Sequence, residues 1–453
     1  MQVIIPNTVG QGAFTRASVA NYWNSSGVLT SAANDVVRIT YNPLSLTSPP
    51  YALIEAAATN ILLNSATLST QSVTVTASAY TLSFYGTGTI TLSGVATGAI
   101  VGVGVSPNRR TYTFTPTAGT LALTVTGTVQ NAQLETGASA TSYITTTGTT
   151  ATRAADVIGT NGLIYSNIAE PDATWPAWNS ATAYVVGNQV SINHRQYVCV
   201  VNNTNRNPST DTVTPPAWTD YGPTNRYAMF DSVVGTSTSS TSSNIIVVLK
   251  TGQVNGASFM QMACDKVQIT QSDSNGLIYS NSIDMTSGGT LTWYDYFTKA
   301  KTRIMNYSLT DLPTSINGVI TIVITSASGT VSAGNVVVGP VFTFTNTGTP
   351  NSVQAGATTG IIDYSVKTTD AFGNTSWTKR GYANRMNVKM MIDTGDLDAT
   401  VNQLAAIRAT PCVWIAAGNI WQSLQVYGAY KDWEIEIAYT TKSFCSLTIE
   451  GLT

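Results

Sequence analysis

The chain has 453 residues, of which 43% are hydrophobic and only 10% are charged, and its formal net charge is −2. An ordinary soluble domain carries about 25% charged residues, and a chain of this length forms several cores rather than one. The near-zero charge and the lack of a lysine- and arginine-rich run argue against a nucleic-acid partner, and no run of about 18 apolar residues is present that would span a bilayer.

Small and β-branched residues take the place that lysine and glutamate occupy in most soluble proteins. Threonine and valine suit the pleated, half-buried surface of a strand. We therefore expect a mostly β chain with a multidomain antiparallel β-sandwich or jelly-roll architecture and a C-terminal α+β unit. Five segments are expected: a docking segment at 1–65, a jelly-roll domain at 66–160, a small aromatic-rich module at 161–228, a second sandwich at 229–349 and an α+β assembly domain at 350–453.

The first segment, residues 1–65, lacks a regular hydrophobic period. Prolines at positions 43, 49 and 50 interrupt it, and proline is excluded from helix interiors and central strands. Residues 53–63 fit either a short helix or an extended arm. We interpret the whole segment as a docking segment that wraps against neighbouring chains.

Residues 66–160 carry apolar side chains at every second position in several short runs. These runs are 72–77, 80–85, 89–93, 110–116 and 120–126. Period-two alternation predicts strands with one buried and one solvated face, and glycine-rich turns at short spacing predict antiparallel connections. Two such sheets packed face to face form a sandwich or jelly roll.

A series of short motifs in the first third of the chain is more specific. They are Phe-Thr-Arg-Ala-Ser at 14–18, Leu-Ile-Glu at 53–55, Thr-Asn-Ile-Leu-Leu at 59–63, Leu-Ser-Phe-Tyr-Gly-Thr-Gly at 82–88, the strand pair at 114–127, Ala-Gln-Leu-Glu at 132–135, Ala-Thr-Ser-Tyr-Ile at 140–144 and Thr-Arg-Ala-Ala-Asp at 152–156. In this order they resemble a module common in phage tail and virion proteins. The resemblance implies a jelly-roll fold of the carbohydrate-binding-module type, with no fixed set of ligand residues.

Aromatic residues and prolines crowd together in the third segment, residues 161–228. Its framework of Trp178, Tyr184, Gly187, Tyr197 and Trp218 resembles the small chitin-binding modules of carbohydrate-active enzymes. An exposed flat ring can stack on the apolar face of a sugar. A module of this size also needs aromatic rings for its own core, so the rings have two interpretations, core packing and sugar or partner contact.

Six aromatic residues are the candidates for contact with a glycan or a partner. They are Trp175, Trp178, Tyr184, Tyr197, Trp218 and Tyr221. Among them we expect Trp175 and Tyr221 to be the exposed pair, because both lie outside the alternating strands. The only histidine, His194, follows Asn193 between two alternating runs, which predicts a hairpin turn and a non-catalytic role.

The second sandwich is predicted from the strand-like runs 245–249, 266–270, 278–279, 319–324 and 336–344, after a hydroxyl-rich loop at 236–243 that we expect to be flexible. The heptapeptide Asn-Gly-Leu-Ile-Tyr-Ser-Asn occurs twice, at 161–167 and 275–281. No period repeats around it, so we interpret it as a reused strand and turn and not as a solenoid repeat.

The last segment, residues 350–453, differs because it contains a helix. Apolar residues at 397, 401, 404 and 407 follow helical spacing over residues 394–408, and strands are predicted on either side of it. This α+β unit loosely resembles the C-terminal parts of phage tail proteins that assemble near the baseplate.

The search for chemistry finds weak candidates only. Asp393, Asp396 and Asp398 could bind calcium, but acidic residues at a helix start have their own electrostatic role, which we favour. The carboxylate pairs Asp363 with Asp370 and Glu434 with Glu436 could be proposed for glycoside hydrolysis, and we expect the second pair to be a solvated strand face. The four scattered cysteines argue against zinc, and we expect free buried thiols; a contact between Cys412 and Cys445 stays open.

These observations predict a non-enzymatic structural component of a phage tail or baseplate, made in the host cytoplasm and without a cofactor or metal. The expected partners are other tail proteins, further copies of the chain (a trimer by analogy) and a host-surface glycan used in attachment. One alternative is a free glycan-binding, chitin-type adhesin, against which the lack of a recognisable secretion signal speaks. The other is a glycan depolymerase, which needs paired carboxylates in a cleft or a repetitive β-helix.

Overall fold

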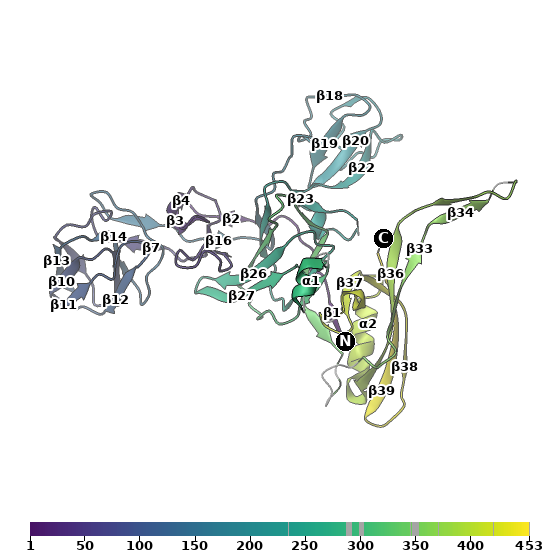
Figure 1. Ribbon diagram of the computed structural model, residues 1–453. Coiled ribbons are helices and arrows are strands. Elements are labelled where there is room, and N and C mark those ends of the chain that lie inside the picture. The colour runs from purple at the N-terminus through teal and green to yellow at the C-terminus, as the bar shows by residue number, and fades with distance from the viewer. Residues whose placement is uncertain are drawn as a thin grey trace.

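The computed structural model describes residues 1–233, 235–286, 292–298, 303–344, 346, 353–369, 371–419 and 421–452. Strands dominate these residues, and their sheets are built from antiparallel ladders. Figure 1 shows an elongated molecule, with the first sandwich at one end, the second sandwich in the middle and the C-terminal sheet at the other end. The predicted fold class, a mostly β multidomain sandwich with a C-terminal α+β unit, is confirmed.

The first sandwich packs a sheet of order β11-β10-β13-β8 on a sheet of order β12-β9-β14. The strands are β8 (Gln71–Val75), β9 (Tyr80–Tyr85), β10 (Thr89–Gly94), β11 (Gly98–Val101), β12 (Arg110–Phe114), β13 (Gly119–Thr126) and β14 (Gln130–Thr136). Leu82, Phe84, Leu121 and Leu123 are buried between the sheets. The alternating runs thus form strands, as predicted.

Strand β9 departs from the expectation of one solvated face, because all six of its residues are buried. Its second face is covered by polar groups: the Arg109 guanidinium donates to Ser83 Oγ at 2.7 Å and to the carbonyl of Thr141 at 2.6 Å. Thr81 Oγ1 donates to the carbonyl of Gly137 at 2.8 Å. The hydroxyl residues of β9 therefore point into a polar interior and not into solvent.

The segment predicted to dock, residues 1–65, packs against its own chain; its contact with neighbouring chains stays a prediction. It contributes β2 (Phe14–Thr15), β3 (Ala20–Trp23), β4 (Leu29–Ala32), β5 (Ile39–Thr40), β6 (Tyr51–Ala52) and β7 (Ala58–Asn60), with β15 (Ala151–Arg153) and β16 (Val157–Ile158) as later partners. Residues 53–63 are extended and contain no helix. Val37, Ile39, Ala52 and Ile54 pack onto the second sandwich beside Val248.

A buried ion-pair network joins this segment to residues 142–156. Asp156 accepts from Arg16 at 3.1 Å and from Arg38 at 2.6 Å. Glu55 pairs with Arg38 at 2.8 Å and with Arg153 at 3.0 Å. The three guanidinium groups and Asp156 are at most 1% exposed, and Glu55 is 11% exposed. Buried charges require partners of this kind.

The network contains residues from several of the short motifs described above. Arg16 and Glu55 come from two of the motifs, and Arg153 and Asp156 both come from a third, at 152–156. The motif at 132–135 supplies Glu135, whose carboxylate accepts from Thr141 at 2.6 Å. Residues that lie far apart in the sequence are therefore brought together in one polar interior. The motifs specify the packing of the module and not a ligand surface.

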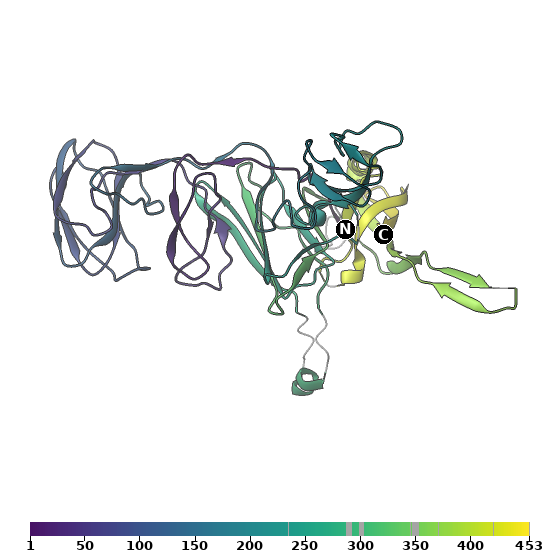
Figure 2. The same cartoon turned by 90° about the horizontal axis from the view of Figure 1, so that it is seen from above.

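The second sandwich is built on a five-stranded sheet of order β17-β24-β29-β26-β27, packed against the sheet β28-β25-β31 and the pair β23-β30. The strands are β17 (Gly162–Ser166), β23 (Thr238–Ser240), β24 (Asn244–Lys250), β25 (Gly256–Met260), β26 (Lys266–Asp273), β27 (Gly276–Asp284), β28 (Tyr307–Leu309), β29 (Val319–Thr325), β30 (Val331–Ala333) and β31 (Asn335–Gly339). Figure 2 shows α1 (Trp293–Thr298) standing away from this sandwich.

The repeated heptapeptide forms both edge strands of the five-stranded sheet, β17 and β27. Each copy has a glycine with positive φ, Gly162 and Gly276, and the register shifts at the same isoleucine in both copies, Ile164 and Ile278. A bulge twists an edge strand and disfavours pairing with another chain. The repeat therefore forms a bulged edge strand at each side of the sheet. Its first copy belongs to this sandwich and not to the small module.

The small module contains β18 (Ala183–Tyr184), β19 (Gln189–Ile192), β20 (Arg195–Cys199), β21 (Asn203–Thr204) and β22 (Trp218–Pro223), and the turn η1 (Ala228–Phe230) follows it. Strands β19, β20 and β22 form one sheet. In Figure 1 the module projects from the middle of the molecule.

The C-terminal sheet has seven strands in the order β32-β1-β37-β38-β39-β36-β33. They are β1 (Gln2–Ile4), β32 (Val341–Thr343), β33 (Thr358–Asp363), β36 (Tyr382–Asp393), β37 (Cys412–Ile415), β38 (Gln425–Glu436) and β39 (Lys442–Gly451), with η2 (Thr394–Asp396), α2 (Leu397–Ala406) and η3 (Gln422–Leu424) between them. The helix predicted at 394–408 is confirmed. The sheet also recruits β1 and β32, which we had assigned to other segments; the expected boundary at 349/350 lies outside the described residues.

One hairpin extends beyond this sheet. We call residues 358–369 and 371–382 the arm. Its base is β33, the edge strand of the sheet, with the first residue of β36, and its outer part is the hairpin of β34 (Val366–Thr369) and β35 (Thr375–Thr378). In Figure 1 it projects at the upper right, away from both sandwiches. No helix in the described part of the chain is long and apolar enough to cross a membrane.

Candidate functional site

The hairpin predicted around the only histidine is present. Asn193 and His194 both have positive φ, 51° and 64°, and they join β19 to β20. Two successive positive φ values define the turn type that suits two-residue hairpins. His194 Nδ1 lies 3.0 Å from Glu170 Oε2, and its ring lies 4.1 Å from the ring of Tyr227. The histidine therefore holds the module against the second sandwich.

Three of the six aromatic candidates form the core of the module. Tyr184, Tyr197 and Trp218 are 5–7% exposed and pack with Val190 and Cys199. The rings of Tyr184 and Trp218 meet edge to face at 5.1 Å. Among the two interpretations, core packing holds for these three residues. Trp178 is partly buried against the same cluster.

The expected exposed pair, Trp175 and Tyr221, is in contact, with ring centroids 5.0 Å apart. Tyr221 is 69% exposed, but Trp175 is only 9% exposed, so its predicted exposure is wrong. The backbone of Trp175 is fixed by Asp172, which accepts from its N–H at 2.8 Å, and by Ser191, which donates to its carbonyl at 2.8 Å. Tyr221 covers the ring, so one exposed flat ring remains from the pair.

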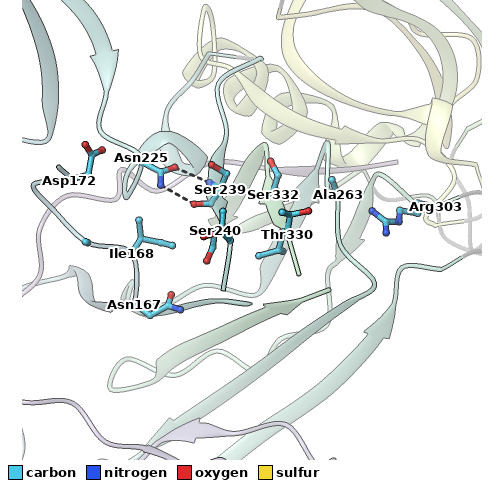
Figure 3. Close-up of a pocket in the computed structure, with 13 residues that line it drawn as sticks. Asn167, Ile168, Asp172, Asn225, Ser239, Ser240, Ala263, Arg303, Thr330 and Ser332 are labelled. Carbon is cyan, nitrogen blue, oxygen red and sulfur yellow. Dashed lines mark hydrogen bonds between the residues drawn. The ribbon is translucent and has the colours of Figure 1, made fainter. Parts of the chain in front are cut away.

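A cleft of about 630 Å³ with a mixed polar and apolar lining lies at the junction of the small module and the second sandwich. Figure 3 shows its residues, which come from the segment before the module, from β23 and from β30. The alternation of β23 and β30 builds its floor: Thr238, Val331 and Ala333 are buried, whereas Ser239 is exposed and lies opposite Ser332 in the ladder. Side chains two residues apart share a face of a strand.

Both ends of the cleft carry a charge. Figure 3 places Asp172 and Asn225 at one end and Arg303 at the other. The side-chain amide of Asn225 donates to the carbonyl of Ser239 and accepts from its N–H, both at 2.9 Å, which fixes β23 against the module. Arg303 pairs with Asp265 at 3.1 Å.

Sequence reasoning missed this cleft because it interpreted residues 236–243 as a flexible loop. Strand β23 lies within that range, so the interpretation is wrong at its centre. The sequence carries no usable signal for this strand. Thr238, Ser239, Ser240 and Thr241 all carry a hydroxyl, so the alternation of buried and exposed positions does not appear as a hydrophobic period. The partner strand, 80 or more residues later, is not visible from local sequence.

The three aspartates considered as a calcium site have other structural roles. Asp393 forms an ion pair with Lys442, which accounts for one member of the proposed calcium cluster. Asp396 precedes α2 and Asp398 lies in its first turn. Within the described ranges, no group of three His, Cys, Asp or Glu residues is placed to hold a metal.

Of the two proposed hydrolytic pairs, the structure describes both members of one only. Glu434 and Glu436 are exposed on β38, and Glu436 lies 3.9 Å from Lys389. The hydrogen bonds from Ser365 hold the pKa of Asp363 below its usual value. Asp370, the other member of its pair, lies outside the described residues.

All four cysteines are buried and free, as predicted, and Cys412 and Cys445 do not form a disulfide. Burial raises the pKa of Cys412 and of Cys445 to about 12. The pKa of Cys264 is also raised to about 12, by burial and by Asp265 beside it. A thiol with so high a pKa is a poor nucleophile at neutral pH.

The arm presents aromatic side chains to solvent. Every described residue from 371 to 382 is exposed, including Phe372 at 90% and Trp377 at 69%. The Lys367 ammonium lies 5.8 Å from the Trp377 ring centre. A groove of about 350 Å³ lies at the base of the arm, lined by Ile361, Asp363, Ser365, Trp377, Lys379, Arg380 and Tyr382.

Comparison with known proteins adds little. No family model matches the sequence, and no curated protein matches it. Among solved structures, the chain is similar to a GH78 family rhamnosidase of Bacillus sp. GL1, with 11% sequence identity and a TM-score of 0.20. The match covers 80% of this chain and 36% of the rhamnosidase chain. A likeness this distant carries no argument about activity.

Proposed function

We propose that this chain is a structural, non-catalytic component of a bacteriophage tail or baseplate, which assembles with copies of itself and with other tail proteins and contributes glycan contacts to the host surface. The observation that carries the proposal is the arm. A two-stranded hairpin without a core is marginally stable in water, and a cluster of exposed aromatic residues marks a contact surface. The resemblance of the short motifs to phage tail modules supports the same assignment.

Charge supports a second copy of the chain as the neighbour that covers the arm. Lys367, Lys379 and Arg380 give the arm a basic character. Exposed acidic residues Glu434 and Glu436 lie on β38, and Glu436 is 3.9 Å from Lys389, which leaves Glu434 for a contact with a neighbour. We expect a neighbouring copy to bring the two surfaces together, because opposite charges complement each other at an interface.

Two other observations are compatible with the proposal. Four free buried thiols suit a protein made in a reducing cytoplasm. The elongated row of sandwiches leaves a large surface with few charges for contacts along the particle. The exposed ring of Tyr221 favours the alternative of a free glycan-binding adhesin, which would bind chitin oligomers as a monomer.

The test is the mass of the purified protein in solution. We expect sedimentation velocity to show a species at a multiple of 47.8 kDa. The double substitution Trp377→Ser with Tyr382→Ser removes two exposed rings, and we expect it to weaken self-association about tenfold or more. The matched control is Tyr221→Ser, an exposed aromatic residue outside the arm, which should leave the mass unchanged. A wild-type protein that sediments only at 47.8 kDa would contradict self-assembly.

A further inference from the structure

We propose that the cleft between the small module and the second sandwich binds a neutral oligosaccharide. The inference rests on the proposed function only for its glycan contact, to which it gives a place and a ligand class; it does not depend on self-assembly. It also moves the glycan contact away from the aromatic module, where sequence reasoning placed it.

The floor of the cleft is a set of four hydroxyls. Ser239 and Ser332 lie opposite each other in the ladder of β23 and β30. Thr241 and Thr330, just beyond the ends of β23 and β30, add two further hydroxyls to the lining.

These hydroxyls are not used by the fold. Within the described residues, the side-chain hydroxyls of Ser239, Ser332, Thr241 and Thr330 have no hydrogen-bond partner, whereas the neighbouring Ser240 Oγ lies 2.7 Å from Ser242 Oγ. A hydroxyl donates one hydrogen bond and accepts two. A sugar presents the same groups in return, so each hydroxyl of the floor can both donate to and accept from a ring substituent.

The cleft also has apolar walls that suit the C–H faces of a sugar ring. Ile168, Ala263 and Val331 contribute to its lining. Its volume of about 630 Å³ lies within the range of about 300–1,000 Å³ that is typical of small-molecule sites, which often lie at domain junctions. Hydroxyl groups beside small apolar patches fit a ligand that alternates polar and apolar surface.

The charges at the two ends select a neutral ligand. Asp172 repels anions at one end, and the Arg303 charge at the other end is already paired with Asp265 at 3.1 Å. An anionic sugar would face one repulsive carboxylate and one neutralised guanidinium. Both groups can still hydrogen-bond to sugar hydroxyls without requiring a charge on the ligand.

The experiment is a titration of the purified full-length chain with three probes: maltotriose, triacetylchitotriose and, as the anionic comparator, trigalacturonate. Binding is measured by ligand-detected NMR and by calorimetry. We expect at least one neutral trisaccharide to bind and trigalacturonate not to bind. The double substitution Ser239→Ala with Ser332→Ala should raise the dissociation constant about tenfold or more, because it removes two hydrogen-bonding hydroxyls.

The matched control is Ser72→Ala with Ser93→Ala, two exposed serines that flank Ala122 on the outer face of the first sandwich; it should leave binding unchanged. Three results overturn the inference: no probe binds, trigalacturonate binds most tightly, or binding survives the cleft substitutions but is lost in Tyr221→Ala. Sedimentation velocity of the same variants tests self-assembly independently of sugar binding, because the cleft substitutions should leave the mass unchanged.

Discussion

Replacing Asp156 with alanine is expected to lower the free energy of unfolding by about 3–5 kcal/mol, because the change leaves the buried Arg16 guanidinium without a carboxylate and leaves Arg38 with Glu55 alone. Asp156 is the shared partner of Arg16 and Arg38, and all three side chains are fully buried. Urea unfolding followed by circular dichroism measures the effect. The loss of stability should appear in the unfolding transition of residues 13–158, because the network joins both ends of that range.

The matched control is Asp220→Ala. Asp220 also pairs with an arginine, Arg195, at 2.6 Å, but the side chains are 42% and 47% exposed. An exposed ion pair contributes less than about 1 kcal/mol. Equal losses from both substitutions would show that burial of the Asp156 network does not have the energetic role assigned here.

The same network has a pH dependence. Burial alone would raise the pKa of Glu55, but the charges of Arg153 and Arg38 and the hydrogen bonds from Ser142 outweigh it, so the pKa is lowered. The stabilisation is therefore fully present above the ordinary carboxyl pKa and is lost as pH falls through the lower, folded-state value.

Trp218→Ala is the second substitution with a large expected effect, about 3–5 kcal/mol against the stability of the small module. Trp218 is 5% exposed, packs edge to face with Tyr184, and donates from Nε1 to the carbonyl of Arg206 at 2.8 Å. Hydrogen exchange should show loss of protection in β19, β20 and β22. By contrast, Tyr221→Ala should preserve that protection, since its ring is exposed. Unchanged protection in Trp218→Ala would contradict the core assignment.

The sequence predicted elements well where a hydrophobic period was strong. The strands of the first sandwich, the helix α2 and the turn at Asn193 and His194 were confirmed, because each depends on local spacing or on two backbone angles. The long strand β38 on the C-terminal side of that helix contains a bulge near Tyr430. A bulge shifts the side-chain period and hides the continuity of such a strand.

The sequence could not predict contacts that join distant segments. Strand β1 enters the C-terminal sheet between β32 and β37, more than 300 residues away along the chain. In the buried network, Arg16 and Arg38 reach Asp156 across 140 and 118 residues. The cleft residues Ser239 and Ser332 are neighbours only because β23 pairs with β30. Burial of Trp175 likewise depends on where Tyr221 lies.

The central claim is that the exposed arm is completed by a neighbouring chain in an assembled particle. An electron-microscopic reconstruction of phage particles that contain this chain tests it most directly. We predict several copies in the tail or baseplate, with Trp377 and Tyr382 of each copy buried against a neighbour. A chain absent from the particle, or present with its arm in solvent, would contradict the account.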